Sequence, residues 1–403
     1  ATARAAARTV PAAGETTSVP GDADDPAIWV HPTDPARSLV IGTDKDHGLV
    51  TWSLDGRVVQ EIPSGEPNNV DVRYGFSLGG ATVDIVATGN RETSTIDVYR
   101  VDPVARRLGL VSGDGIVPRD LDEIYGFCMY RSLVQDRYYA FVNDKDGDVE
   151  QWELFDDDGA IHGRLVRAFD VGTRTEGCVA DTQTGMFFIS AERQSIWRYG
   201  AEPGDADARV LVDGAATDGP GDHLVPEVEG LAIYYGPGGA GYLIASSQGS
   251  DDFVVYDRRP PHRYIGRFHV VADGGSDAVT HTDGIAVTNV ALGRAFAHGL
   301  LVVQDAHDED PYNNFKLVAW QDVARGLDPP LMVDTWSYDP RNPTQVRLPS
   351  ATTSGRATSA SPAASASAAA RARSAASSSG PKSASSMLKA ARSGYHSGMS
   401  RRP

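Results

Sequence analysis

Three short segments of this sequence place an acidic residue directly before a glycine. The acids are separated by 53 residues (176 to 229) and 54 residues (229 to 283), and the segments are Thr175-Glu176-Gly177, Val228-Glu229-Gly230 and Thr282-Asp283-Gly284. Carboxylates that a repeating fold gathers at one place repel one another, and their pKa values rise unless cations lie between them. Oxygen donors without a His/Cys cluster select hard cations, and Ca²⁺ accepts about six to eight such donors. The pattern therefore predicts a calcium site where the repeats meet.

Basic residues recur at a second repeated position. Lys45, Arg91 and Lys145 follow the second expected strand of the first three units, and Arg193 follows that of the fourth. An antiparallel unit starts its first strand beside the end of its second, so these bases are expected on the same face as the acids. Asp71 is also expected on this face.

Three sequence patterns recur along the chain, and together they indicate six repeating units. The acidic segments are the first of these patterns. A β-rich run that ends in polar residues recurs at 39–42, 83–86, 139–142, 187–190, 242–245 and 300–303. An aromatic residue follows in the next expected strand, at Trp52, Tyr99, Trp152, Trp197, Tyr256 and Trp320. Short β-branched and aromatic runs bounded by Gly, Asp, Asn and Pro predict strands, and nothing long has a helical period. We therefore expect an all-β protein, a six-bladed β-propeller of four-stranded antiparallel blades around a central channel, with a large β-sandwich as the alternative.

Composition divides the chain into three parts. The Ala/Arg-rich residues 1–13 are expected to form a loose N-terminal segment, residues 14–348 the propeller domain, and the basic Ala/Ser-rich residues 349–403 a disordered tail. The whole chain has a net charge of −17, and because the stretch from Ala351 onward carries eight basic residues and no acid, the rest carries −25. Such a body is expected to repel nucleic acid and anionic membranes and to attract cations.

The sequence indicates the cellular location and the oligomeric state less directly than it indicates the fold. No apolar run approaches the roughly 20 residues that a membrane span requires. The sequence starts at Ala and shows no hydrophobic signal segment, which favours a mature secreted form or a trimmed form, and we expect a monomer. Cys128 and Cys178 fall at the expected innermost strands of neighbouring units, where a disulfide and two buried thiols both agree with the sequence.

Motifs of several other hydrolases are absent. Neither cysteine has an Arg six residues later, and the sequence contains no Arg-His-Gly-x-Arg, Gly-x-Ser-x-Gly or Gly-x-x-x-x-Gly-Lys segment. Residues 144–150 resemble the start of a calcium-binding loop but lack the twelve-residue pattern, so we interpret them as an acidic turn that carries Lys145. A water activated by a metal needs no protein nucleophile, which agrees with these absences.

From about Asp22 to Trp320 the chain resembles the β-propeller phytases, the alkaline calcium-dependent enzymes that hydrolyse phytate. No single segment would identify this family, but nine segments taken together do. The resemblance is carried by Asp24-Asp25-Pro26-Ala27-Ile28-Trp29, Asn68-Asn69-Val70-Asp71-Val72-Arg73-Tyr74, Tyr125-Gly126-Phe127, Glu150-Gln151-Trp152-Glu153-Leu154, Thr175-Glu176-Gly177, Glu229-Gly230-Leu231, Ser246-Ser247-Gln248-Gly249, Thr282-Asp283-Gly284 and Asn314-Phe315-Lys316.

The resemblance implies a 3-phytase-type phosphoric monoester hydrolase that acts on phytate as its calcium complex and uses several Ca²⁺ ions. It implies a catalytic calcium cluster held by Asp24, Tyr125, Glu176, Glu192, Glu227, Glu229 and Asp283. It implies further metal ligands at Asp25, Gln248, Asp277 and Asp305. Lys45, Arg91 and Lys145 are expected to contact phosphate and to act in catalysis with Tyr125 and Glu176, and Arg193 is expected to bind substrate. Glu227 stands where the family usually has Asp.

Two other functions agree with parts of the pattern. A calcium-dependent lactonase or esterase on a similar propeller would share the central acids but has little use for three cations at equivalent positions. A non-catalytic propeller would serve as a binding scaffold, and it predicts no turnover of any phosphate ester in the presence of calcium.

Overall fold

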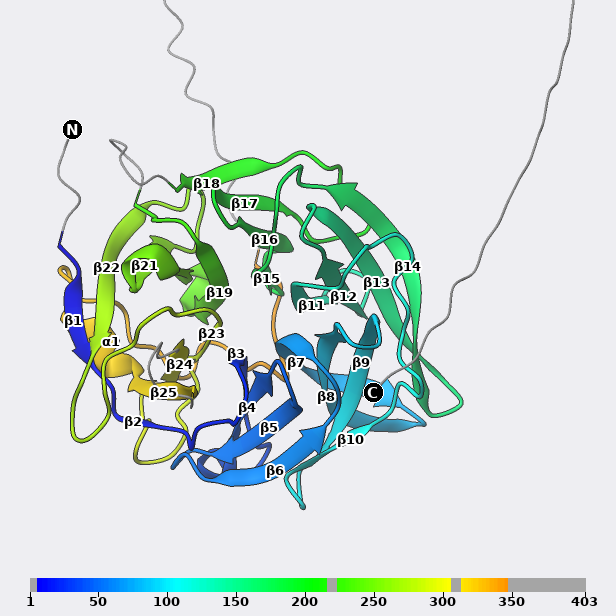
Figure 1. The fold of residues 1–403 in the computed structure, drawn as a ribbon, viewed down its shortest axis with the longest axis horizontal. Helices are drawn as coiled ribbons and strands as arrows, with labels where there is room; N and C mark the ends of the chain where they lie inside the picture. Colours follow the sequence, from blue (N-terminus) through cyan, green and yellow to red (C-terminus); the bar gives the residue numbers. More distant parts are fainter. Residues whose placement is uncertain (1–5, 216–222, 306–312, 347–403) are drawn as a thin grey trace, which may run out of the picture. The chain divides into compact units, whose positions relative to one another are not determined.

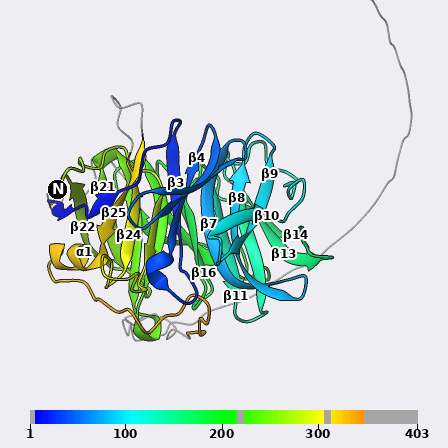
Figure 2. The ribbon, with the colours of Figure 1, turned by 90° about the horizontal axis from the view of Figure 1, so that it is seen from below.

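The computed structural model describes residues 6–215, 223–305 and 313–346, and the expected tail at 349–403 lies outside them. The described residues form six antiparallel sheets arranged around a central axis, which Figure 1 shows end-on and Figure 2 from the side. The predicted six-bladed propeller is therefore confirmed, and the β-sandwich alternative is wrong. Among the described residues, no helix has the length and apolar character needed to cross a membrane.

Each blade begins with the strand nearest the axis, and in blades 1 to 4 the strands continue outward in sequence order. Blade 1 consists of β3 (Ala23–Trp29), β4 (Leu39–Asp44), β5 (Gly48–Ser53) and β6 (Val58–Pro63). Blade 2 consists of β7 (Pro67–Leu78), β8 (Ala81–Asn90), β9 (Thr95–Asp102) and β10 (Arg107–Leu110). Blade 3 consists of β11 (Phe127–Ser132), β12 (Arg137–Asn143), β13 (Asp148–Asp157) and β14 (Ala160–Asp170). Blade 4 consists of β15 (Cys178–Asp181), β16 (Met186–Ala191), β17 (Ser195–Gly200) and β18 (Val210–Gly214).

The last two blades are completed by the N-terminal strands. Blade 5 consists of β19 (Val228–Tyr235), β20 (Gly241–Ser247), β21 (Asp252–Asp257) and β22 (Tyr264–Val271), with β1 (Arg8–Pro11) added in parallel to β22. Blade 6 consists of β23 (Ile285–Thr288), β24 (Leu300–Asp305), β25 (Asn314–Ala319) and β2 (Gly14–Glu15), which pairs with β25. The expectation of a loose segment at 1–13 is therefore wrong for Arg8–Pro11, because that stretch is hydrogen-bonded into blade 5.

Helices are few and short in the described part of the chain. They are the 3-10 turns η1 (Pro35–Arg37), η2 (Pro237–Gly239) and η3 (Gln248–Ser250), and the α-helix α1 (Trp320–Gly326). The repeated aromatic residue lies in the third strand of the first five blades, but Trp320 begins α1 instead. Its ring is buried and stacks on Tyr234 of blade 5 at 3.9 Å between centroids, so a core role replaces the expected strand position.

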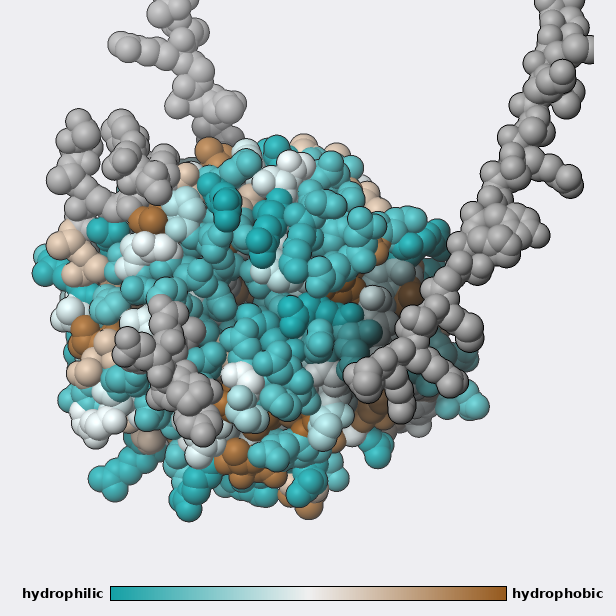
Figure 3. All heavy atoms as spheres, in the orientation of Figure 1, coloured by the Kyte–Doolittle hydropathy of each residue, from teal (hydrophilic) through white to brown (hydrophobic). Residues whose placement is uncertain are grey.

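The hydrophobic core lies between neighbouring blades rather than at one centre. Strands with buried side chains on both faces, such as β24, supply these inter-blade layers. Between blades 3 and 4, for example, the rings of Phe141 and Phe187 stack with centroids 4.1 Å apart. The molecular surface in the orientation of Figure 1 is mostly hydrophilic, as Figure 3 shows, with hydrophobic patches mainly toward the rim. Burial between the sheets leaves the blade ends free to carry polar residues.

A disulfide links Cys128 of β11 to Cys178 of β15, with Cα atoms 5.7 Å apart. The sequence left a disulfide and two free thiols open, and the structure has the disulfide. It joins the innermost strands of blades 3 and 4. The bond closes a loop across a sequence separation of 50 residues, so it restricts the unfolded chain and stabilises the fold.

The segment after α1 crosses one end of the propeller, and it is the orange segment in Figure 2. The Tyr338 ring stacks on Tyr235 of blade 5 at 3.8 Å, Arg341 forms an ion pair with Asp84 of blade 2, and Val346 N donates to Gln183 O of blade 4 at 2.8 Å. Tyr235 is the last residue of an innermost strand. The segment therefore covers the end opposite to the starts of the innermost strands.

Candidate functional site

The acid-Gly segments meet because each packs backbone against backbone with the next blade. Gly230 N donates to Asp283 O at 3.1 Å, and Gly284 N donates to Asp24 O at 2.9 Å. A Cβ atom on Gly230 would lie 2.8 Å from Gly284 Cα, and one on Gly177 would lie 2.8 Å from the carbonyl carbon of Glu229. Glycine is therefore required for the close approach, and the acid before it is held at the axis. This contact explains why a glycine follows the acid in each segment.

Three carboxylates form the centre of the site. Glu176, Glu192 and Glu229 are buried, and each offers an oxygen within 4.8 Å of the others. Asn68 Nδ2 donates to Glu176 Oε1 at 2.8 Å. Within the described structure, the buried oxygens Glu229 Oε2 and Asp24 Oδ2 have no hydrogen-bond partner. Buried anionic oxygens without a partner are costly, and a hard cation supplies the partner that they lack.

The remaining acids of the cluster adjoin this triad. Asp283 accepts a hydrogen bond from Gln248 Nε2, and Glu176 acts electrostatically on both Asp24 and Asp283. Among the described residues, the donor set consists of carboxylate and amide oxygens together with the Tyr125 hydroxyl, without His or Cys. This set fits Ca²⁺, which accepts many oxygen ligands in irregular geometry.

Burial raises the pKa values of the clustered acids. Burial raises the pKa of Asp24 to about 6 although Lys45 opposes the shift, and burial together with Glu176 raises the pKa of Glu192 to about 7. The pKa values of Glu229 and Asp283 are raised well above their ordinary values, first by burial and then by neighbouring carboxylates. Without a cation the cluster therefore retains protons near neutral pH, and a metal ion must displace them.

A pH-dependent loss of stability should follow in the metal-free protein. A carboxyl whose folded-state pKa is raised stabilises the fold fully below its unfolded pKa, and that stabilisation is lost as pH rises through the folded pKa. For Asp24 and Glu192 the window extends from about pH 4 to pH 7. We expect the unfolding free energy of EDTA-treated protein to fall by about 2 kcal/mol or more between pH 5 and pH 8. Urea unfolding at both pH values measures it.

Added Ca²⁺ should remove this decline, because the cation replaces the lost protons as the counter-charge. Metal-free protein whose unfolding free energy is constant or increases from pH 5 to pH 8 would contradict the clustering of protonated acids.

Lys45 lies inside the acidic cluster, as the repeat registers predicted. Its Nζ is 3.0 Å from Asp22 Oδ2, 3.0 Å from Asp24 Oδ1 and 3.8 Å from Asp283 Oδ2. Burial opposes the charged ammonium, but the carboxylates of Asp24, Asp283 and Asp22 together raise the pKa of Lys45 above its ordinary value. Arg91 Nη2 donates to the carbonyl oxygen of Lys45 at 3.3 Å, which places the two bases next to each other.

Tyr125 connects the cluster to further cations. Lys145 Nζ lies 4.7 Å from the centroid of the Tyr125 ring and 3.0 Å from Glu123 Oε2. Burial and then the charges of Glu176 and Glu192 raise the pKa of Tyr125, so the phenol keeps its proton. These contacts bring Lys145 and Tyr125 to the same face as the triad.

At the rim, Arg193 Nη2 lies 3.1 Å from Glu227 Oε1, and both side chains are more exposed than the triad. Glu227 immediately precedes β19, while Glu229 lies within that strand and is buried. Glu227 therefore lies beside the cluster rather than at its centre.

Three acids that were expected to bind metal contact other protein groups. Asp277 and Asp305 surround the buried ammonium of Lys316, which is 2.9 Å from Asp305 Oδ2 and 2.6 Å from Glu15 Oε2. Asp25 contacts the backbone instead, because its Oδ2 accepts a hydrogen bond from Val70 N at 2.9 Å. Their predicted metal roles stay predictions.

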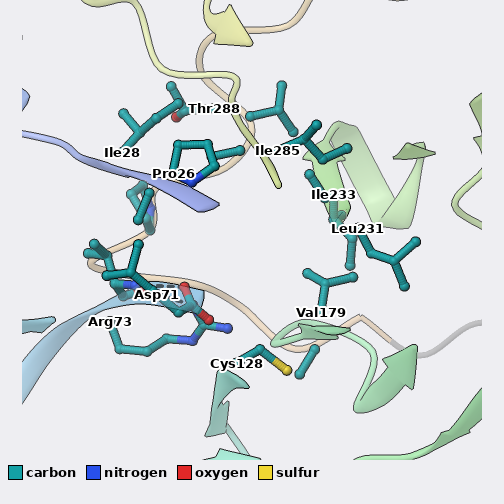
Figure 4. A pocket seen from close by; sticks show the side chains of 18 of the residues that line it. Pro26, Ile28, Asp71, Arg73, Cys128, Val179, Leu231, Ile233, Ile285 and Thr288 are labelled. Atoms are coloured by element: carbon teal, nitrogen blue, oxygen red, sulfur yellow. Dashed lines mark hydrogen bonds and ion pairs between the residues drawn. The ribbon is translucent and has the colours of Figure 1, made fainter. Parts of the chain in front are cut away.

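Asp71 does not lie on the acidic face, so that expectation is wrong. It lines a cavity of about 160 Å³ in the central channel, where Figure 4 shows it beside Arg73. Asp71 Oδ1 accepts from Arg73 Nη1 at 2.7 Å, and Met129 N donates to Asp71 Oδ2 at 2.8 Å. Both carboxylate oxygens are thus satisfied by protein donors.

The sequence reasoning missed three polar neighbours of the cluster. Asn68 supports Glu176, Asp22 pairs with Lys45, and Arg174 contacts Glu192 with Nε 2.6 Å from Oε1. Arg174 was detectable in principle, because it precedes the acid of the first acid-Gly segment by two positions. Asn68 and Asp22 belong to no repeated register, so only the fold places them here.

Comparison with known proteins gives matches in sequence and in structure. The phytase family model matches residues 1–345. The 3-phytase of Bacillus subtilis (strain 168) is 40% identical over 313 residues, which cover 76% of this chain and 81% of that protein. A luciferin-regenerating enzyme has a TM-score of 0.48 at 10% identity, covering 83% of this chain and 97% of that one. The β-propeller domain of Myceliophteria thermophila Cps50 (Swd1) has a TM-score of 0.40 at 10% identity, covering 73% of this chain and 83% of that one.

Proposed function

Because this chain belongs to the phytase family and hydrolyses phytate, we propose that the acidic face is its active site and that bound Ca²⁺ makes the reaction possible there. One observation carries the proposal. The buried triad of Glu176, Glu192 and Glu229 converges within 4.8 Å, and one of its oxygens lacks a partner among the described residues. A polyanion cannot approach such a cluster until its charge is reversed.

The residues that would hold the cations are the clustered acids Asp24, Glu176, Glu192, Glu229 and Asp283, with Tyr125, Glu227 and Gln248 at their edge. Bound Ca²⁺ would supply positive charge for the phosphate oxygens of a calcium–phytate complex and lower the pKa of a coordinated water. No protein nucleophile is needed for this chemistry, in agreement with the sequence.

The chain's own cations position the substrate. Lys45 lies against Asp24 and Asp283, so a phosphate that reaches the cluster comes within range of its ammonium, which offsets charge developing on the phosphoryl oxygens. Arg91 adjoins Lys45 through the backbone carbonyl and extends the cationic surface. Lys145 and Arg193 lie farther out and would bind other phosphates of the same substrate. The Tyr125 hydroxyl accepts a hydrogen bond from Arg174 Nη2 at 2.7 Å, and the Lys145 ammonium lies 4.7 Å from the centroid of its ring.

The two alternative functions, a lactonase or esterase and a binding scaffold, agree less well with the family and with the site. Family membership excludes a purely structural platform and favours phosphate esters over lactones. The position of Lys45 in direct contact with the acids agrees with this choice, because a neutral ester has no phosphate charge to offset.

We also propose that the protein is secreted and monomeric. The disulfide between Cys128 and Cys178 supports an oxidising compartment. The ring is closed within one chain by β1 and β2, so a second copy is not needed to complete a blade.

Chelation tests the metal dependence. Phosphate release from phytate should be measured with Ca²⁺, after EDTA, and after Ca²⁺ is restored. We expect EDTA to lower the rate at least about tenfold and restored Ca²⁺ to return it, because the acidic cluster alone repels the substrate. A rate that EDTA leaves unchanged would rule out the calcium mechanism.

A further inference from the structure

Arg174 is a cation on the acidic face that the repeated registers do not include. It lies in the loop between β14 and β15, two residues before Glu176. Its carbonyl oxygen accepts a hydrogen bond from Glu192 N at 3.2 Å, so the loop backbone is fixed to the strand end that carries Glu192. The side chain is 42% exposed, whereas the Glu192 side chain is 1% exposed. Arg174 therefore lies over the buried triad at its solvent side.

The guanidinium is held at two of its three nitrogens. Nε lies 2.6 Å from Glu192 Oε1, and Nη2 donates to the Tyr125 hydroxyl at 2.7 Å. The guanidinium carbon is 5.0 Å from the centroid of the Tyr125 ring, which adds a cation–π contact. Nη1 has no partner among the residues that the structure describes. A guanidinium fixed in this way, with one free edge, is preorganised to donate hydrogen bonds to a phosphate.

The surroundings of Arg174 favour an anion with several charges. Lys145 lies on the same Tyr125 ring, with Nζ 4.7 Å from its centroid, and is 40% exposed. Two cations on one aromatic ring concentrate positive charge at the edge of the cluster. A substrate that carries several phosphates can bind these cations and the cluster together, whereas a single phosphate cannot.

We propose that Arg174 is a specificity-determining residue that binds a substrate phosphate through its free edge while it holds Tyr125 and Glu192 in place. This inference rests on the proposed function of the acidic face. It predicts that Arg174 contributes to the binding of densely phosphorylated substrates more than to the binding of the metal.

Arg174→Gln tests the proposal, and Arg164→Gln is the matched control. Arg164 is an exposed arginine whose guanidinium pairs with Glu153 in blade 3, so its replacement makes the same charge change outside the acidic face. With Ca²⁺ at saturation, we expect Arg174→Gln to raise the KM for phytate and the Kd for myo-inositol hexasulfate about tenfold, and the control to change either by less than about twofold. The hexasulfate reports binding without turnover. Arg174→Lys should recover only part of the loss, because lysine lacks the planar fork.

Titration of Ca²⁺ into the substrate-free variant separates binding from a structural role. If Arg174 only orients Glu192 and Tyr125, the variant will bind Ca²⁺ more weakly, and its hexasulfate affinity at saturating Ca²⁺ will match that of the wild type. That result would overturn the proposal, and so would an unchanged KM. If the wild-type protein released no phosphate from phytate with Ca²⁺ present, the proposed function itself would fail, whatever Arg174→Gln does.

Discussion

Replacing Glu176 by glutamine is expected to lower phosphate release from phytate about a thousandfold. Glu176 is within 4.8 Å of Glu192 and Glu229 through its carboxylate, and it is the acid that Asn68 of blade 2 supports. The amide keeps the size of the side chain but removes one negative charge from the centre of the cluster. Ca²⁺ affinity should therefore fall together with turnover. Phosphate assays and Ca²⁺ titrations on the same preparation measure both.

Glu150→Gln is the matched control for Glu176→Gln. Glu150 is as deeply buried, but its carboxylate accepts hydrogen bonds from Arg119 N, Asp120 N and the Trp152 indole, so protein donors already satisfy it. Its amide variant should lose some stability and keep turnover and Ca²⁺ affinity within about threefold of the wild type. Retention of full Ca²⁺ affinity by Glu176→Gln would show that the cation binds elsewhere.

Lys45→Met should separate turnover from metal binding. The Lys45 side chain is 18% exposed and its ammonium contacts Asp22, Asp24 and Asp283. Methionine preserves the length but leaves these acids without their protein counter-charge, so Ca²⁺ affinity should stay the same or increase. Turnover of phytate should nevertheless fall about a hundredfold, because the charge that faces the phosphoryl oxygens is gone.

Lys145→Met makes the same charge change at a more exposed position. Its ammonium pairs with Glu123 and lies over Tyr125 instead of touching the clustered acids. We expect its effect mainly in KM, whereas Lys45→Met should act mainly on kcat. If Lys45→Met kept most of its kcat, or lost Ca²⁺ binding, the placement of Lys45 at the reacting phosphate would be wrong.

The repeated parts of the fold could be predicted from the sequence. The acid-Gly segments, the apolar runs and the aromatic positions together gave six blades, and antiparallel geometry placed Lys45 beside Asp24 and Asp283. These predictions succeeded because the same backbone contact recurs in several blades. Gly177 and Gly230 illustrate it, since each packs directly on the next acid-Gly segment.

The features that could not be predicted from the sequence depend on contacts that occur only once in the fold. β1 and β2 are too short to show a periodic pattern, and their partners lie far along the chain. Asp71 is an acid near the start of an innermost strand, but it lies deeper in the channel, where Arg73 pairs with it. Arg174 and Asn68 support the triad through side-chain contacts that do not recur from blade to blade. Such contacts follow from the three-dimensional packing and leave no repeat in the sequence.

The order in which the ring is assembled follows from its closure. Arg8 pairs with Phe268 and Gly14 pairs with Leu317, so β1 and β2 are synthesised long before their partner strands and can pair only after β22 and β25 have been made. Until then the outer edges of β22 and β25 have no cover, and exposed strand edges invite pairing with other chains. Clipping of the polypeptide before Thr16 would reopen the same two edges in the finished enzyme.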